Sequence, residues 1–80
     1  MNKNEIIKLS DLKVNEKCEI CGFSFDKEGI ERLNSLGIKK GEQITSLRIA
    51  PYSHTVIIAL GGRLFALRGE TAEGVLVRRL

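Results

Sequence analysis

The sequence feature that most constrains the fold is Gly37, which stands between a helical pattern and a strand pattern. Leu33 and Leu36 lie three positions apart just before it, at helical spacing. Glycine commonly ends a helix in the left-handed conformation, which other residues enter only at a cost. Ile38 then falls where the apolar residue of such a helix end packs against Leu33. The stretch predicts a helix that begins at the capping residue Asp26, ends at about Leu36 and leads into a strand.

Strand signals surround this helix. Residues 43–50 indicate a long strand, which Pro51 ends because proline has no N–H to donate. Residues 56–60 are continuously apolar, which favours a central position in a small barrel. Gly61-Gly62 predicts a two-residue hairpin turn, because both glycines can adopt positive φ. The predicted strands are residues 16–23, 43–50, 56–60, 63–67 and 75–79, with a helical turn or tight connection at residues 69–74.

The N-terminus is predicted to contribute less. Residues 1–8 are polar apart from Ile6 and Ile7, and we expect a loosely held lead-in. Leu9 and Leu12 bracket a turn and are expected to pin this end to the core. The prediction is therefore one mainly β domain over residues 1–80, a small five-stranded barrel with one short inserted helix.

The charge of the chain argues against nucleic acid as a partner. Thirteen basic and ten acidic residues give a net charge of +3. The two signs alternate along the chain, and no block of like charge exceeds two residues, whereas a nucleic-acid surface needs a basic patch. Few aromatic residues are present to stack on bases.

Targeting signals are also lacking in the sequence as given. No segment approaches the roughly 20 apolar residues that span a bilayer. The first residues show neither an apolar region nor a small-residue cleavage site. We therefore expect a cytoplasmic protein without direct membrane insertion, which reaches a membrane only through a partner.

Two residue types raise the question of a metal. Cys18 and Cys21 form a C-E-I-C motif, but a structural zinc site needs four ligands and the chain has no second cysteine pair. Residues three apart on a strand point to opposite faces, so we expect Cys18 inside and Cys21 exposed. His54 is the only histidine. His54 and Cys21 are weak candidates for a transient ferrous-iron site, and no metal or other cofactor is expected to be required.

The remaining candidates concern a protein partner. No Ser/His/Asp or paired-carboxylate arrangement is evident, so the chain is not expected to be an enzyme. Exposed loop residues held by a rigid scaffold commonly make contacts. We predict partner-binding roles for Pro51, Tyr52 and His54 in the loop before residues 56–60, and for Arg68 at a strand end.

The ordered motifs resemble a known family. R-L-x-x-L-G-I-x-x-G-x-x-I is followed by L-R-x-A-P, an apolar strand, G-G-x-L-F-A-L-R and a terminal V-x-V. From about Leu9 to Val77 this set resembles FeoA, the small cytoplasmic accessory protein of bacterial ferrous-iron uptake. The resemblance implies an SH3-like barrel that binds the cytoplasmic part of the ferrous-iron permease, a membrane protein with a GTP-binding domain. The family's loop pattern of a small residue, Asp and Pro is replaced here by Y-S-H-T.

Two other classes of function stay open. The barrel also resembles the C-terminal domain of iron-dependent repressors, which suggests a metal-binding regulatory domain. A helix-turn-helix and dimerisation helices do not fit into eighty residues, which argues against an autonomous repressor. A ferrous-iron carrier is the third class, and it needs ligands that are not evident.

Overall fold

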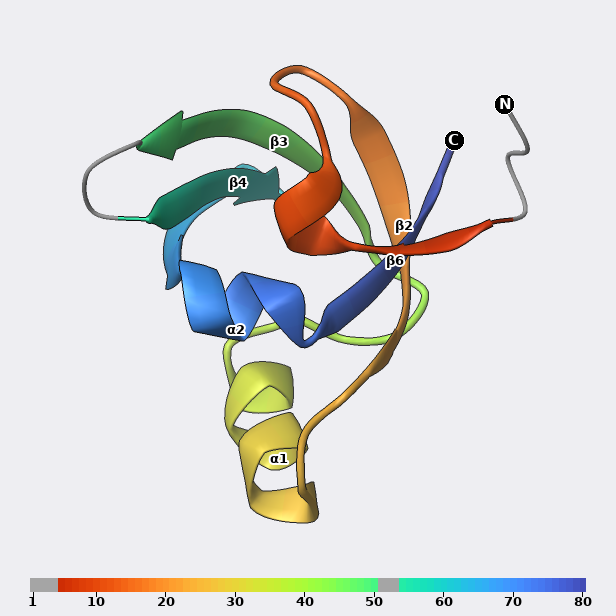
Figure 1. The fold of residues 1–80 in the computed structure, drawn as a ribbon. Helices are drawn as coiled ribbons and strands as arrows, with labels where there is room; N and C mark the ends of the chain where they lie inside the picture. Colours follow the sequence, from red (N-terminus) through yellow and green to blue (C-terminus); the bar gives the residue numbers. More distant parts are fainter. Residues whose placement is uncertain (1–4, 51–53) are drawn as a thin grey trace.

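The computed structural model describes residues 5–50 and 54–80, and for residues 48–50 it describes the backbone alone. Its main element is an antiparallel sheet of six strands in the order β1-β6-β2-β3-β4-β5 (Figure 1). The elements are β1 (Ile6–Lys8), the 3-10 turn η1 (Leu9–Asp11), β2 (Lys17–Phe23), α1 (Lys27–Ser35), β3 (Gln43–Ala50), β4 (Thr55–Leu60), β5 (Arg63–Arg68), α2 (Gly69–Glu73) and β6 (Val75–Arg79).

The strand count corrects the sequence-based prediction. Ile6–Lys8 is not a loose lead-in: it forms β1, which pairs antiparallel with β6 through Ile6 opposite Arg78. Three residues are too few to show an alternating pattern, and the pairing joins opposite ends of the chain. β1 and β5 are the two ends of the strand order, and no pairing joins them among the described residues. The domain is therefore a curved open sheet of six strands rather than a closed five-stranded barrel.

The helix end predicted at Gly37 is confirmed. Gly37 has φ 97°, and its N–H donates to the carbonyl of Asn34 at 3.0 Å. The N–H of Ile38 donates to the carbonyl of Leu33, also at 3.0 Å. This is the Schellman arrangement, in which the last carbonyls of the helix find donors beyond its end. At the other end of α1, Asp26 Oδ1 accepts the N–H of Gly29 at 2.8 Å, as expected for a helix cap.

The hairpin between β4 and β5 is also confirmed. Gly61 and Gly62 have φ of 57° and 80°, the pattern of a type I′ turn. β4 lies between β3 and β5, but its burial alternates along the strand. Only every second side chain of this apolar run is buried, because the other face of an open sheet is left uncovered.

The core lies against one face of the sheet and is almost entirely aliphatic. Leu9 and Leu12 are 0% and 1% exposed, so the predicted turn at the N-terminus does pin that end of the chain. α2 and η1 lie beside the sheet at the end of β5 (Figure 1). The buried apolar residues are Leu9, Leu12, Cys18, Ile20, Leu33, Ile38, Ile44, Val56, Ile58, Leu60, Leu67, Ala72, Val75 and Val77.

Candidate partner-binding site

An open hollow of about 570 Å³ lies where β4 begins and β5 passes into α2. Two of the residues predicted to bind a partner, His54 and Arg68, line it together. The other two, Pro51 and Tyr52, fall outside the residues that the structure describes. The remaining lining residues are Ser10, Thr55, Val56, Gly69, Glu70 and Glu73.

Strand register brings His54 and Arg68 to the same place. Thr55 is the Cα partner of Arg68 in the β4–β5 pairing, so His54 precedes β4 next to the end of β5. α2 begins directly after Arg68, which has the extended backbone of a helix N-cap residue. Gly69 then lies so close to His54 that an added Cβ would be 2.8 Å from the His54 carbonyl oxygen. Only a residue without a Cβ allows this approach, so the sequence at this junction determines the shape of the hollow.

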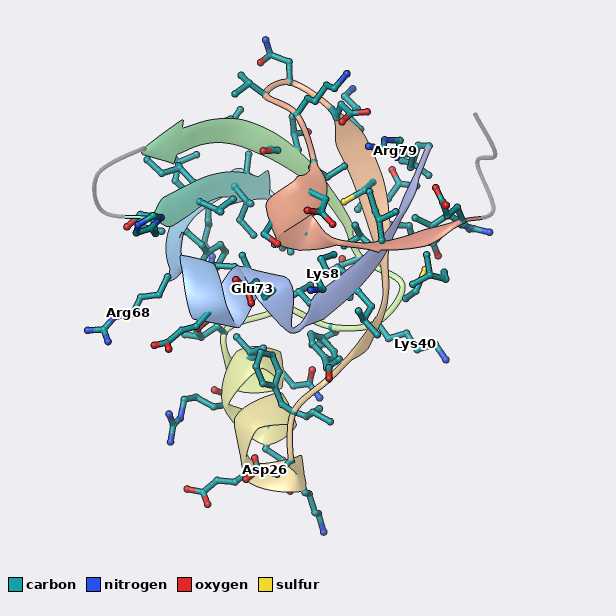
Figure 2. The ribbon with its side chains drawn as sticks, in the orientation of Figure 1. Lys8, Asp26, Lys40, Arg68, Glu73 and Arg79 are labelled. Atoms are coloured by element: carbon teal, nitrogen blue, oxygen red, sulfur yellow. The ribbon has the colours of Figure 1, made fainter. Side chains whose placement is uncertain are left out.

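The charges around the hollow are mixed. Arg68 is exposed, and Figure 2 shows its side chain extending away from the body of the protein. Among the described residues, Arg68 makes no ion pair or side-chain hydrogen bond. Glu70 is the second residue of α2 and Glu73 is the last, and both are exposed. The arrangement suits recognition of a charged or polar partner.

The other C-terminal arginines are engaged in the structure itself. Arg79 Nε lies 2.8 Å from Glu16 Oε2, and Arg78 pairs with Glu19 across β2 and β6. Glu16 also accepts the backbone N–H of Lys13 at 2.7 Å. That hydrogen bond, with the Arg79 guanidinium as a second cause, holds the pKa of Glu16 below its usual range. These ion pairs link β6 to β2 and to the residue that precedes β2.

Arg63 has a similar structural role at the start of β5. Its Nη2 donates to the carbonyl of Leu36 at 2.5 Å, beyond the end of α1. The guanidinium carbon also lies 5.1 Å from the centre of the Phe65 ring, within the range of a cation–π contact.

The metal candidates do not come together in the hollow. Cys21 lies on β2, where its Sγ donates to the Glu19 carbonyl at 3.6 Å, and it is not among the lining residues. In the part of the chain that the structure describes, no group of three or more His, Cys, Asp or Glu side chains is placed to hold a metal ion. Weak ferrous-iron binding at His54 or Cys21 therefore stays a prediction.

The two cysteines differ in environment. Cys18 is 0% exposed, as predicted, and burial raises the pKa of its thiol to about 12. Cys21 is half-buried rather than exposed. The pairing of β2 with β6 shifts its register between Ile20 and Gly22, and this bulge disturbs the simple alternation from which exposure was predicted.

Sequence reasoning missed part of the hollow. It identified Arg68 and His54, but it assigned Glu70 and Glu73 only to a turn or tight connection. The available signal was that the predicted helical turn directly follows a strand. Polar residues in such a turn lie close to the end of the strand. Ser10 lies within the turn that Leu9 and Leu12 bracket, and its place in the hollow follows from η1 packing near α2.

A family model described as the FeoA domain matches residues 7–79, nearly the whole chain. The chain belongs to the FeoA family. The resemblance found in the sequence is thereby confirmed. A comparison with curated proteins found no match.

Solved structures agree with membership of the FeoA family. The chain is 26% identical to an iron uptake regulatory protein (FeoA) of known crystal structure, with a TM-score of 0.85, covering 95% of this chain and 99% of that one. It is 31% identical to the FeoA protein of Chlorobium tepidum, with a TM-score of 0.84, covering 92% of this chain and 70% of that one. Both are similar over nearly the whole fold, which supports an SH3-like arrangement of the strands.

The fold is also found within larger regulators. A manganese-dependent transcriptional repressor in complex with manganese matches with a TM-score of 0.87 at 17% identity, over 94% of this chain but 37% of the repressor. At this identity the likeness shows the fold alone. Within the described residues of this FeoA chain, no helix has the length and apolar character needed to cross a bilayer.

Proposed function

We propose that this FeoA-family protein is a non-enzymatic accessory protein of ferrous-iron uptake. It binds the cytoplasmic GTP-binding domain of a ferrous-iron permease and modulates transport. It acts in the cytoplasm and reaches the membrane through that partner, and it requires no cofactor for binding. The observation that carries the proposal is the family match over residues 7–79, together with the similarity to a protein described as an iron uptake regulatory protein.

The hollow supports a binding role. Arg68 and His54 are exposed; Arg68 pairs with Thr55 at the end of β5, and His54 directly precedes Thr55. A rigid scaffold lowers the entropy lost on binding, and an exposed arginine that forms no ion pair with any described residue is available to an acidic partner. The structure of the hollow is therefore suited to contact with another protein.

The test is retention of the permease by the tagged protein on an affinity resin, from detergent-solubilised membranes. We expect wild-type protein to retain the permease, and purified GTP-binding domain to bind in calorimetry. Arg68→Glu should weaken that binding about tenfold or more, because an interface charge is reversed. Arg32→Glu is the matched control, since Arg32 is exposed on α1 and its pair with Glu28 is a 3.8 Å surface contact. Failure of the wild-type protein to retain the permease, or to bind its domain, would contradict the proposal.

A metal-responsive regulatory domain is the second candidate. The shared fold with a manganese-dependent repressor favours it. Titration with ferrous iron and with manganese under anaerobic conditions tests it, with His54→Ala and Cys21→Ser as variants. Stoichiometric binding that is lost in either variant supports this candidate, and wild-type affinity in both variants argues against these residues as ligands.

A further inference from the structure

Strand β5 is an open edge of the sheet. It ends the strand order, and its pairing with β4 runs from Thr55 opposite Arg68 to Leu60 opposite Arg63 without a shift in register. The other end strand, β1, has only three residues. Short edge strands and bulges are ways in which proteins prevent further pairing, and β5 has neither.

The hairpin turn determines which backbone groups of β5 are available. A type I′ two-residue turn closes on a hydrogen-bonded pair, here Leu60 and Arg63, and such pairs alternate along antiparallel strands. The N–H and C=O groups of every second residue from Arg63 therefore point to β4. Those of Leu64 and Ala66 point away from the sheet, and no backbone hydrogen bond to them is formed from the described residues outside β4.

The side chains at these two positions leave the edge accessible. Leu64 is 68% exposed, more than any other large apolar residue whose side chain the structure describes, and Ala66 is exposed as well. No proline or charge interrupts β5 between its terminal arginines. An apolar edge of this length without such protection is suited to accept another strand.

Charge indicates what kind of strand fits. Arg68 stands at one end of the edge and forms no ion pair with the residues that the structure describes, and its side chain extends away from the protein and from Glu73 (Figure 2). If the β5 strands of two copies paired antiparallel through their free backbone groups, Leu64 of each copy would lie opposite Ala66 of the other. Arg68 would then lie opposite Gly62. No carboxylate would then meet the arginine. A second copy is thus a poorer occupant than an acidic segment.

We propose that the β5 edge binds an extended segment of another protein by strand addition. The segment contributes backbone hydrogen bonds to Leu64 and Ala66, small or apolar side chains beside them, and an acidic residue that pairs with Arg68. This inference rests on the proposed function, because the segment belongs to the partner that the accessory protein binds. It adds the surface and the chemistry of contact, which family membership does not supply.

Two synthetic peptides of alternating valine and threonine test the edge, one with glutamate at both ends and one with lysine. Each is titrated into the ¹⁵N-labelled full chain and followed by amide chemical shifts. We expect the glutamate peptide to shift the amides of Leu64 and Ala66 more than those of Phe65 and Leu67. The lysine peptide should bind more weakly.

Two variants separate the backbone contribution from the charge. Ala66→Pro removes an N–H that points away from β4, so the sheet should persist while peptide binding is lost. Arg68→Gln should retain the fold, weaken the glutamate peptide about two- to fivefold, as for an exposed ion pair, and reduce its preference over the lysine peptide. Should Ala66→Pro fail to fold, Leu64→Glu takes its place, since a negative side chain at the edge repels the acidic peptide.

Three results would overturn the inference: no shift at β5 with either peptide, shifts confined to another surface, or shifts at Leu64 that arise from protein concentration alone and thus from a second copy. The experiment is separable from that on the proposed function. Permease domain that binds Ala66→Pro as well as wild type would refute the edge and leave the accessory role intact. If the peptides bind the β5 edge but this protein has no affinity for the permease domain, the proposed partner is refuted and the strand-binding edge stands.

Discussion

The ring of Phe25 occupies the space that a side chain at Gly74 would need. A Cβ built on Gly74 would lie 2.2 Å from Cζ of the ring, far inside van der Waals contact. The N–H of Ser24 donates to the carbonyl of Gly74 at 2.7 Å, so the two segments are also joined through their backbones. The segment before α1 is thus packed against the junction of α2 and β6.

Gly74→Ala should destabilise the protein by about 1–3 kcal/mol, because the Phe25 ring has to leave its place or the backbone has to shift. Urea unfolding followed by circular dichroism measures the loss. Gly22→Ala is the matched control, since a Cβ there meets nothing within 4 Å and should change stability little. Equal stability of the two variants would mean that the Phe25 ring can move to another position without loss of stability.

Gly37→Val should cost more than about 1 kcal/mol, because a β-branched residue resists the positive φ of 97° that closes α1. The space around Gly37 is not the cause, since the nearest atom to an added Cβ is Arg63 Nη2 at 3.6 Å. Gly37→Asn should recover part of the loss, because asparagine tolerates the left-handed region better. A valine variant as stable as wild type in thermal unfolding would disprove this account of the helix end.

The two cysteines should respond differently to substitution and to a thiol reagent. Cys18→Ser should reduce stability because it introduces a hydroxyl at a fully buried position, and Cys21→Ser should have the smaller effect. Cys21 should react with a maleimide in the native protein well before Cys18, as mass spectrometry of timed samples will show. Equal rates, or equal costs of the two substitutions, would contradict the burial difference.

The Cys18 thiol should also make the fold sensitive to alkali. Its pKa is about 12 in the folded protein against an ordinary value of 9.0. The unfolded chain therefore loses the proton first, and the stabilisation is present below pH 9 and declines as the pH rises from 9 towards 12. Comparison of Cys18→Ala with wild type by urea unfolding across this range isolates the effect, which should be absent in the variant.

Glu16 should contribute to stability at neutral pH and lose that contribution in acid. Its pKa is lowered from the ordinary 4.5 in the folded state, so the contribution is present above pH 4.5 and disappears as the pH falls through the folded value. Glu16→Gln should therefore destabilise the protein at pH 7, by an amount that shrinks below pH 4.5. Glu28→Gln serves as the control at pH 7, because its exposed pair with Arg32 should contribute little. A difference that stays constant across the acid range would contradict the argument.

Local signals allowed most of the fold to be predicted from the sequence. Gly37 and Asp26 mark the ends of α1, and Gly61-Gly62 forms the expected hairpin. The strands at residues 43–50 and 75–79 have the predicted bounds. Each of these features depends on residues that are close together in the chain, where turn and capping chemistry is decisive.

Features that depend on distant residues were missed. Ile6–Lys8 becomes a strand only because β6 is available to pair with it, and the contact of Phe25 with Gly74 joins segments about fifty residues apart in sequence. The candidate site shows the same division. Arg68 and His54 were identified singly from residue type, but their convergence depends on the register of β4 and β5, which the sequence pattern leaves open.

Helix α1 connects β2 to β3, two strands that pair directly with one another. It projects from the sheet (Figure 1), and Leu33 is its buried residue. The ends of this connection are already held together by that pairing, so the sheet does not depend on the exposed face of α1. Substitutions on that face can therefore accumulate during evolution without altering the sheet. For the experimenter, the outer face of this helix is a suitable place for a fluorophore or affinity handle that leaves the β5 edge unobstructed.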